Sequence, residues 1–65
     1  MSYCGLGTCQ IKIGKFQKAV GFYQKALELD KNCPYAYTGL GVIYQNTKMY
    51  KESIYNFNKS IKIDP

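Results

Sequence analysis

The sequence predicts an all-α fold of two antiparallel helix-turn-helix hairpins, and three observations support it. The second half of the 65-residue chain repeats the first at an offset of 34 residues. Within each half, apolar residues recur at the spacing of two helices. Breaks separate these stretches, at Gly14 and at Pro34 among other places. The expected helices span residues 2–13, 17–30, 34–47 and 51–63, which places one hairpin in 1–33 and the other in 34–65.

The repeat explains a pair of glycine-rich stretches. Residues 3–8 read Y-C-G-L-G-T, and residues 37–42 read Y-T-G-L-G-V. A Gly-x-Gly can open a phosphate-binding loop, but neither copy continues to a third Gly at the required spacing or to Gly-Lys-Ser/Thr. The glycines therefore belong to the repeat. Because a Gly inside a helix costs about 1 kcal/mol relative to Ala, we expect close helix contacts at Gly7 and Gly41.

Each half carries two apolar stripes, one for each helix. In the second half, Tyr37, Leu40 and Tyr44 recur at i, i+3 and i+7 and form the first stripe. Gly14 suits a left-handed helix end, and Pro34 suits the first turn of the third helix. The other stripe of the second half comprises Tyr50, Ile54, Phe57 and Ile61, and its counterpart in the first half comprises Phe16, Val20, Tyr23 and Leu27.

The composition argues against several classes of protein. The net charge of +5 comes from lysines spread along the chain, and there is no arginine, the residue best suited to bidentate phosphate contacts. This pattern favours a solvated surface over a nucleic-acid site. No apolar run approaches the ~18 residues of a membrane span, and the N-terminus lacks a basic region followed by an apolar one. We therefore expect a cytoplasmic protein.

The reactive side chains do not form a catalytic or metal-binding pattern. Cys4, Cys9 and Cys33 are an odd set, and Cys4 and Cys9 lie five residues apart, on different faces of a helix. No Cys-x-x-Cys occurs, so reduced thiols are expected rather than a disulfide or a metal site. The chain has no His and only four carboxylate side chains, those of Glu28, Asp30, Glu52 and Asp64. No nucleophile has an activating neighbour, so we expect neither an enzyme nor a cofactor.

The repeated residues resemble a known family. The second unit reads Tyr37-x2-Leu40-Gly41-x2-Tyr44, then Ser53-x3-Phe57, then Pro65, which is similar to the tetratricopeptide repeat. The first unit offers Tyr3-x2-Leu6-Gly7 and the stretch G-K-F-Q-K-A-V-G-F-Y-Q-K-A-L-E-L-D at residues 14–30. The resemblance covers essentially the whole chain and implies a short right-handed solenoid. The departures are Tyr for Trp in both units, Ser53 and Ser60 for Ala, Gln10 for Tyr and Lys31 for Pro, and they are expected to weaken the packing in places.

The resemblance also implies a function. In this family the first helix of each hairpin lines a concave groove that binds a peptide or a partner helix, without catalysis. Some members bind the carboxylate end of a chaperone tail there, but Cys4, Thr8 and Gly39 hold the corresponding positions and supply neither charge nor amide donors. Tyr35 is the best candidate for an anchor, because aromatic residues concentrate binding energy. The implied groove residues are Cys4, Thr8, Ile11 and Lys12 from the first hairpin, and Tyr35, Thr38, Val42, Gln45 and Asn46 from the second.

Association with RNA is the alternative function. Some related helical-hairpin repeats bind RNA, and aromatic residues near the lysines could stack on bases. The aromatic residues fall on the apolar stripes, however, which makes a core role the better explanation. The lysines concerned lie on the second helices, at Lys18, Lys25, Lys51, Lys59 and Lys62.

The number of repeats predicts a further partner. About three repeats of this kind are usually needed for independent stability, and this sequence holds two. Both ends look cut from a longer array, or else completed by another copy, so we expect stacking on neighbouring repeats or self-association. The second hairpin should then keep part of its apolar surface exposed, including some of Ile54, Tyr55, Phe57 and Ile61.

Overall fold

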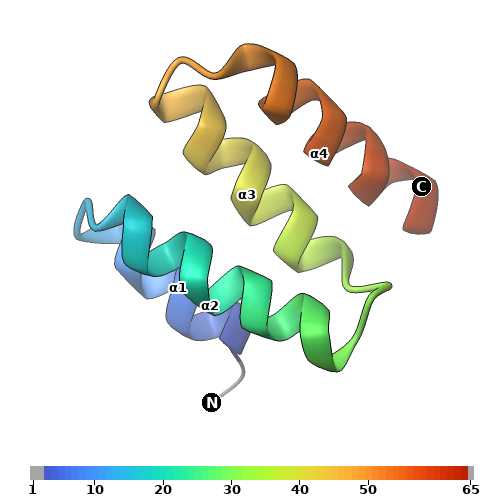
Figure 1. Cartoon of the computed structure of the whole chain (residues 1–65), viewed down its shortest axis with the longest axis horizontal. Helices are drawn as coiled ribbons and strands as arrows, with labels where there is room; N and C mark the ends of the chain where they lie inside the picture. The colour runs from blue at the N-terminus through green and yellow to red at the C-terminus, as the bar shows by residue number, and fades with distance from the viewer. Residues whose placement is uncertain (1–2, 65) are drawn as a thin grey trace.

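A computed structural model describes residues 3–64 and consists of four α-helices (Figure 1). The all-α prediction is confirmed, and the predicted ends that the structure describes lie within one residue of those observed. The predicted start of the first helix at residue 2 lies outside the described residues. The helices are α1 (Tyr3–Lys12), α2 (Phe16–Leu29), α3 (Pro34–Asn46) and α4 (Tyr50–Ile63).

The two hairpin turns have the same hydrogen-bonded geometry, in which the helix ends in a left-handed residue. In the first turn Gly14 has a φ of 82°, and the N–H of Lys15 donates to the carbonyl of Gln10 at 2.8 Å. In the second turn Lys48 has a φ of 65°, and the N–H of Met49 makes the equivalent bond at 2.7 Å. Both turns are Schellman motifs, but only the first has the glycine that the conformation favours.

The helices pack as two pairs, α1 with α2 and α3 with α4 (Figure 1). The third helix lies between the pairs and contacts both α1 and α2. Within the described residues, α3 is the only helix that α4 contacts. The outer side of α4 is therefore the end of the stack in this chain.

The core lies where α2 meets α3. Its buried apolar side chains are at most 8% exposed, and Tyr23 and Ile43 are its largest members. Side chains from α1 and from the end of α3 pack around this cluster, which holds the two hairpins together. The buried residues are Ala19, Tyr23 and Ala26 of α2, and Ala36, Leu40 and Ile43 of α3.

Glycines allow the helices to approach one another closely. A Cβ placed on Gly7 would come within 2.8 Å of the ring of Tyr23, and one on Gly41 within 2.7 Å of the ring of Phe57. The close contacts expected at these two glycines are therefore confirmed. Gly39 is packed even more tightly against Tyr23, so the same ring occupies the space left by two glycines on different helices.

The two serines that replace alanine in the second unit both form hydrogen bonds from α4 to α3. The hydroxyl of Ser53 is buried and donates to the carbonyl of Gly41 at 2.9 Å. The hydroxyl of Ser60 lies 3.1 Å from the carbonyl of Pro34, to which it donates, and 2.7 Å from the hydroxyl of Thr38. Because a buried hydroxyl without a partner is costly, these bonds offset the loss of apolar contact at the two positions.

The outer side of α4 keeps an apolar surface, as its sequence predicts. Ile54 and Ile61 are each 60% exposed, and Tyr50, which begins the same stripe, is 58% exposed. Phe57 is half-buried because its ring packs against Gly41. The residues of the corresponding stripe on α2 are half-buried or buried. The two stripes differ in exposure because α3 packs against α2, whereas no helix within the described residues packs on the outer side of α4.

Candidate peptide-binding groove

A groove runs between α1 and α3 on the side of the molecule where the first helices of the two hairpins face each other. Its volume is about 340 Å³. We call it the α1–α3 groove. It is lined by Thr8, Ile11 and Lys12 of α1, by Tyr35, Thr38, Gly39 and Val42 of α3, and by Tyr23 of α2.

Helical spacing places these side chains on two facing walls. Thr8, Ile11 and Lys12 recur at i, i+3 and i+4, so they share one face of α1. The residues of α3 continue the pattern from Tyr35 to Val42 over two turns of helix. Six of the nine residues predicted for the groove therefore come together in one place.

Tyr23 forms the floor of the groove. It rises from α2 through the space that Gly7 and Gly39 leave open, and it is 1% exposed. Its hydroxyl lies 3.0 Å from the hydroxyl of Thr8, and either oxygen can donate. Burial raises the pKa of Tyr23, while the hydrogen bond with Thr8 acts in the opposite direction. The floor is therefore a neutral phenol at physiological pH.

The walls and rim supply different kinds of contact. Ile11 and Val42 are half-buried and give the walls apolar surface. Tyr35 stands at the rim and is 73% exposed, so a ligand could cover most of its ring. Lys12, at the last turn of α1, is the cation among the lining residues. The groove thus combines apolar walls, hydroxyl groups and one positive charge.

Three of the predicted groove residues do not line it. Cys4 is half-buried, packs against the core cluster and lies with its Sγ 3.2 Å from the Sγ of Cys33. Gln45 and Asn46 are exposed at the end of α3, and the side-chain amide of Asn46 donates to the carbonyl of Val42 at 2.8 Å. Their role in binding a partner stays a prediction, and a ligand longer than the groove would be needed to reach them.

The groove residues implied by the sequence do not include Tyr23, and Gly39 enters there only as a position without the donors of a carboxylate-binding site. Tyr23 is on the apolar stripe of α2, which marks it as a core residue, and it is indeed buried. The available signal was the pair of glycines at Gly7 and Gly39, because a missing side chain on each facing helix leaves room for a ring from beneath. Tyr23 therefore belongs both to the core and to the lining of the groove.

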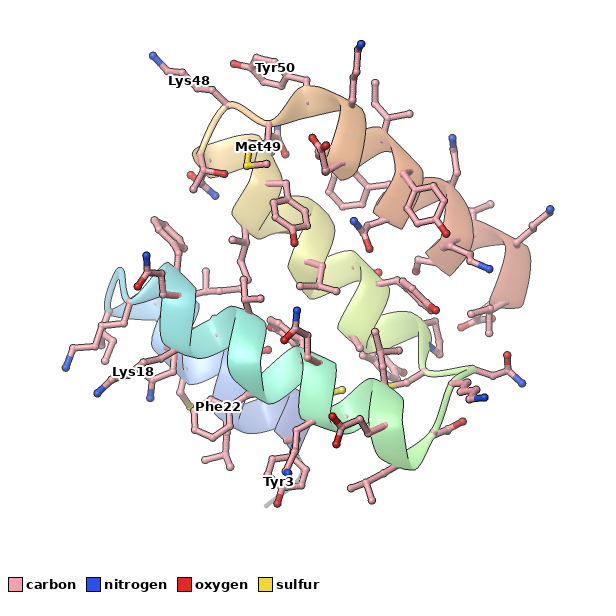
Figure 2. All side chains as sticks on the ribbon, in the orientation of Figure 1. Tyr3, Lys18, Phe22, Lys48, Met49 and Tyr50 are labelled. Atoms are coloured by element: carbon pink, nitrogen blue, oxygen red, sulfur yellow. The ribbon has the colours of Figure 1, made fainter. Side chains whose placement is uncertain are left out.

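Four of the five lysines considered for RNA binding line two other hollows, and Lys51 lines neither of them. Lys18 and Lys25 flank the first, of about 430 Å³, where the rings of Tyr3 and Phe22 stack with their centroids 6.3 Å apart (Figure 2). The second, of about 350 Å³, is on α4 and is lined by Tyr55, Asn58, Lys59 and Lys62. Tyr55 is 61% exposed and lies off the apolar stripe, so it is available for stacking, which the stripe pattern alone did not indicate.

The two stacked helical hairpins, with a groove between their first helices, define a helical-repeat protein. Comparison with known families gives the same class. The tetratricopeptide repeat model matches residues 1–33 and 34–65, so the chain belongs to the tetratricopeptide repeat family. It is also similar to anaphase-promoting complex subunit 3 of Schizosaccharomyces pombe, with 30% identity over 63 residues. The match covers 97% of this chain and 10% of that protein, so the chain spans about a tenth of the relative's length.

Within residues 3–64, no helix is long and apolar enough to cross a bilayer.

Proposed function

We propose that this chain is a protein-interaction module that binds a peptide segment or a partner helix in the α1–α3 groove and performs no catalysis of its own. The observation that carries the proposal is the convergence of Thr8, Ile11, Lys12, Tyr35, Thr38 and Val42 on one groove. Tetratricopeptide repeats are generally protein–protein interaction modules, and the relative named above is a subunit of a protein complex. A scaffold role within a larger protein assembly is consistent with the family and with this relative.

The chemistry of the groove indicates what the ligand would carry. An apolar side chain would pack between Ile11 and Val42, and the ring of Tyr35 would close over it from the rim. A carboxylate would pair with Lys12, the only cation among the lining residues. Because Tyr combines a large apolar area with little conformational freedom, we expect Tyr35 to contribute most to affinity.

A peptide selected from a random display library tests this assignment. Tyr35→Ala should weaken binding of that peptide about tenfold or more, and Val42→Glu should also weaken it by placing an unpaired charge on an apolar wall. Lys59→Glu is the matched control, because Lys59 lies in the hollow on α4 and outside the groove. Circular dichroism and denaturant unfolding establish that each variant remains folded.

The outcome of this experiment separates the groove from the lysine-rich hollows. The proposal is wrong if affinity follows Lys59 and is indifferent to Tyr35 and Val42. An affinity that falls steeply with salt for RNA, and no measurable peptide binding, would instead support the RNA alternative, since phosphate binding releases counterions.

We further propose that the outer side of α4 contacts another helical hairpin, either from a further repeat or from a second copy of this chain. On α2 the equivalent stripe is packed against the core that α3 helps to form, as shown by half-buried Phe16, Val20 and Leu27. On α4 the same positions hold exposed Tyr50, Ile54 and Ile61. A further helix pair that packs on α3 and α4 as α3 packs on α1 and α2 would cover these side chains.

A further inference from the structure

The two half-buried thiols at the start of α1 and at the start of α3 lie in direct contact. Cys4 is in the first turn of α1, and Cys33 immediately precedes Pro34, the first residue of α3. Their Sγ atoms are 3.2 Å apart although the residues are 29 positions apart in sequence. We propose that Cys4 and Cys33 form a reversible intramolecular disulfide when the chain meets a low-molecular-weight disulfide such as oxidised glutathione.

The surroundings of the pair allow the bond to close with small movements. The sulfur atoms must approach by about 1.2 Å to reach the S–S bond length of about 2.05 Å. Cys33 is outside the helix, with an extended backbone (φ −92°, ψ 102°), and its side chain makes no capping bond to α3. Rotation at Cys33 therefore does not require either helix to unfold.

The third cysteine does not compete for this bond in the folded chain. Cys9 is exposed, and it lies five residues after Cys4, on another face of α1. The turns of α1 hold Cys4 and Cys9 in fixed orientations, whereas the tertiary fold brings Cys4 to Cys33. Folding thus selects the pair that is distant in sequence over the pair that is close.

The reaction balances without any group beyond the two thiols and the oxidant. One cysteine, as thiolate, attacks a sulfur of the small disulfide, forms a mixed disulfide and releases one small thiolate. The second cysteine loses its proton to solvent and attacks the mixed disulfide at the protein sulfur, which forms the Cys4–Cys33 bond and releases the second small thiolate. Both small thiolates take up protons. Two protein thiols are oxidised and one small disulfide is reduced to two thiols.

The rate of closure follows from the electrostatics of the pair. Burial is the main reason that the pKa of the Cys4 thiol is raised to about 11, and the hydrogen bond with Cys33 and the electrostatic effects of Cys33 and Asp30 act in the same direction. Because the thiolate is the nucleophile, the reaction should be slow at neutral pH and faster as pH rises.

The disulfide would act on the geometry of the α1–α3 groove. Cys4 is on the helix that forms one wall, and Cys33 adjoins the helix that forms the other. A bond between them fixes the distance between the starting ends of the two walls. The bond itself follows from the contact between the thiols and does not rest on the proposed function of the groove.

Oxidation of the reduced chain with glutathione disulfide, under native conditions and in denaturant, tests the proposal. Digestion and mass spectrometry then identify which cysteines are joined. In the folded chain we expect the Cys4–Cys33 bond to dominate in both the wild type and Cys9→Ser. In denaturant the Cys4–Cys9 bond should gain over it, because the shorter loop closes at lower entropic cost.

The stability of the oxidised chain gives a second readout. A bond across 29 positions should lower the equilibrium constant for unfolding on the order of several hundredfold relative to the reduced chain. Cys33→Ser should remove this difference, and Cys9→Ser should preserve it. The proposal is overturned if the folded chain yields only glutathione adducts or Cys9-linked dimers. It is equally overturned if the native and denatured chains give the same ratio of the Cys4–Cys33 bond to the Cys4–Cys9 bond.

Discussion

The ring of Tyr23 packs directly against the backbone of Gly39, so the second helix of one hairpin meets the first helix of the next without a side chain on α3 between them. The same ring also fills the space beside Gly7 on α1. One residue therefore joins three helices, and it supplies the floor of the groove as well. Stability and the shape of the candidate site depend on the same contact.

This contact predicts that Gly39→Ala will destabilise the fold. The added Cβ would overlap the ring of Tyr23, which is 1% exposed and has no room to move aside. Overpacking of this kind costs about 1–3 kcal/mol of unfolding free energy. Gly21→Ala is the matched control, since nothing lies within 4 Å of its Cβ position and alanine favours a helix by up to about 1 kcal/mol. Urea unfolding showing the two variants equally stable would contradict the account.

The second hairpin turn predicts a stabilising substitution at Lys48. A left-handed conformation costs a residue with a side chain about 1–2 kcal/mol, and Gly14 avoids this cost at the equivalent position of the first turn. Figure 2 shows the side chain of Lys48 extending away from the helices, so its removal loses no packing. Glycine also increases the conformational entropy of the unfolded chain, which offsets part of this gain. Lys48→Gly should therefore raise the free energy of unfolding by about 1 kcal/mol.

Two substitutions make the test at Lys48 specific to the backbone conformation. Gly14→Ala should lower stability, because alanine would be forced to adopt the φ of 82° observed there. Lys51→Gly, at an exposed position within α4, should lower it by about 1 kcal/mol. If Lys48→Gly and Lys51→Gly change the denaturation midpoint in the same direction, the left-handed residue is not the cause.

The exposed stripe of α4 predicts concentration-dependent self-association. Ile54 and Ile61 are each 60% exposed on a surface whose counterpart in the first hairpin is covered. Sedimentation over a concentration series should show a shift towards larger species, and Ile54→Lys or Ile61→Lys should reduce it. Leu29→Lys is the control, because Leu29 is an exposed apolar residue, 75% exposed, at the end of α2 and outside this surface. A monomer at every concentration would mean that two repeats suffice without a partner.

Stability should fall in alkaline solution because a half-buried thiol and a buried phenol hold their protons in the folded state. Burial raises the pKa of Cys4 from 9.0 to about 11, and burial also raises the pKa of Tyr23. Between pH 9 and pH 11 the unfolded chain therefore binds fewer protons than the folded chain, so the unfolding free energy decreases as pH rises. Below pH 9 this contribution is fully present.

Urea unfolding across this range, under reducing conditions, measures the effect. The combined variant Cys4→Ser and Tyr23→Phe should depend less on pH than the wild type, whatever its stability at neutral pH. An unchanged slope in the variant would show that other groups cause the alkaline loss. The reductant is needed because the same rise in pH would favour oxidation of Cys4.

The helices could be predicted from the sequence because several independent signals coincide. The 34-residue offset, the stripes and the helix-end residues Gly14 and Pro34 all indicate the same boundaries. The glycines at Gly7 and Gly41 also predicted close contacts correctly. These features are either local in the sequence or repeated along it, so a single sequence is enough to predict them.

Other features depend on tertiary contacts that have no periodic signal. The contact between Cys4 and Cys33 joins two half-buried side chains across 29 positions, and nothing in either helix pattern marks it. The hydroxyl of Ser53 was expected to weaken the packing, yet it finds the carbonyl of Gly41 at 2.9 Å. Tyr23 serves both the core and the groove, and a stripe assigns it to the core alone.

Chemical-shift mapping tests most directly whether a ligand binds in the α1–α3 groove. Backbone amide shifts of the labelled chain would be followed while a display-selected peptide is added. The largest changes should fall on Thr8, Ile11, Tyr35, Thr38 and Val42, which line the two walls. Changes concentrated instead on Tyr55, Asn58, Lys59 and Lys62 of α4, with the groove residues unmoved, would contradict the account.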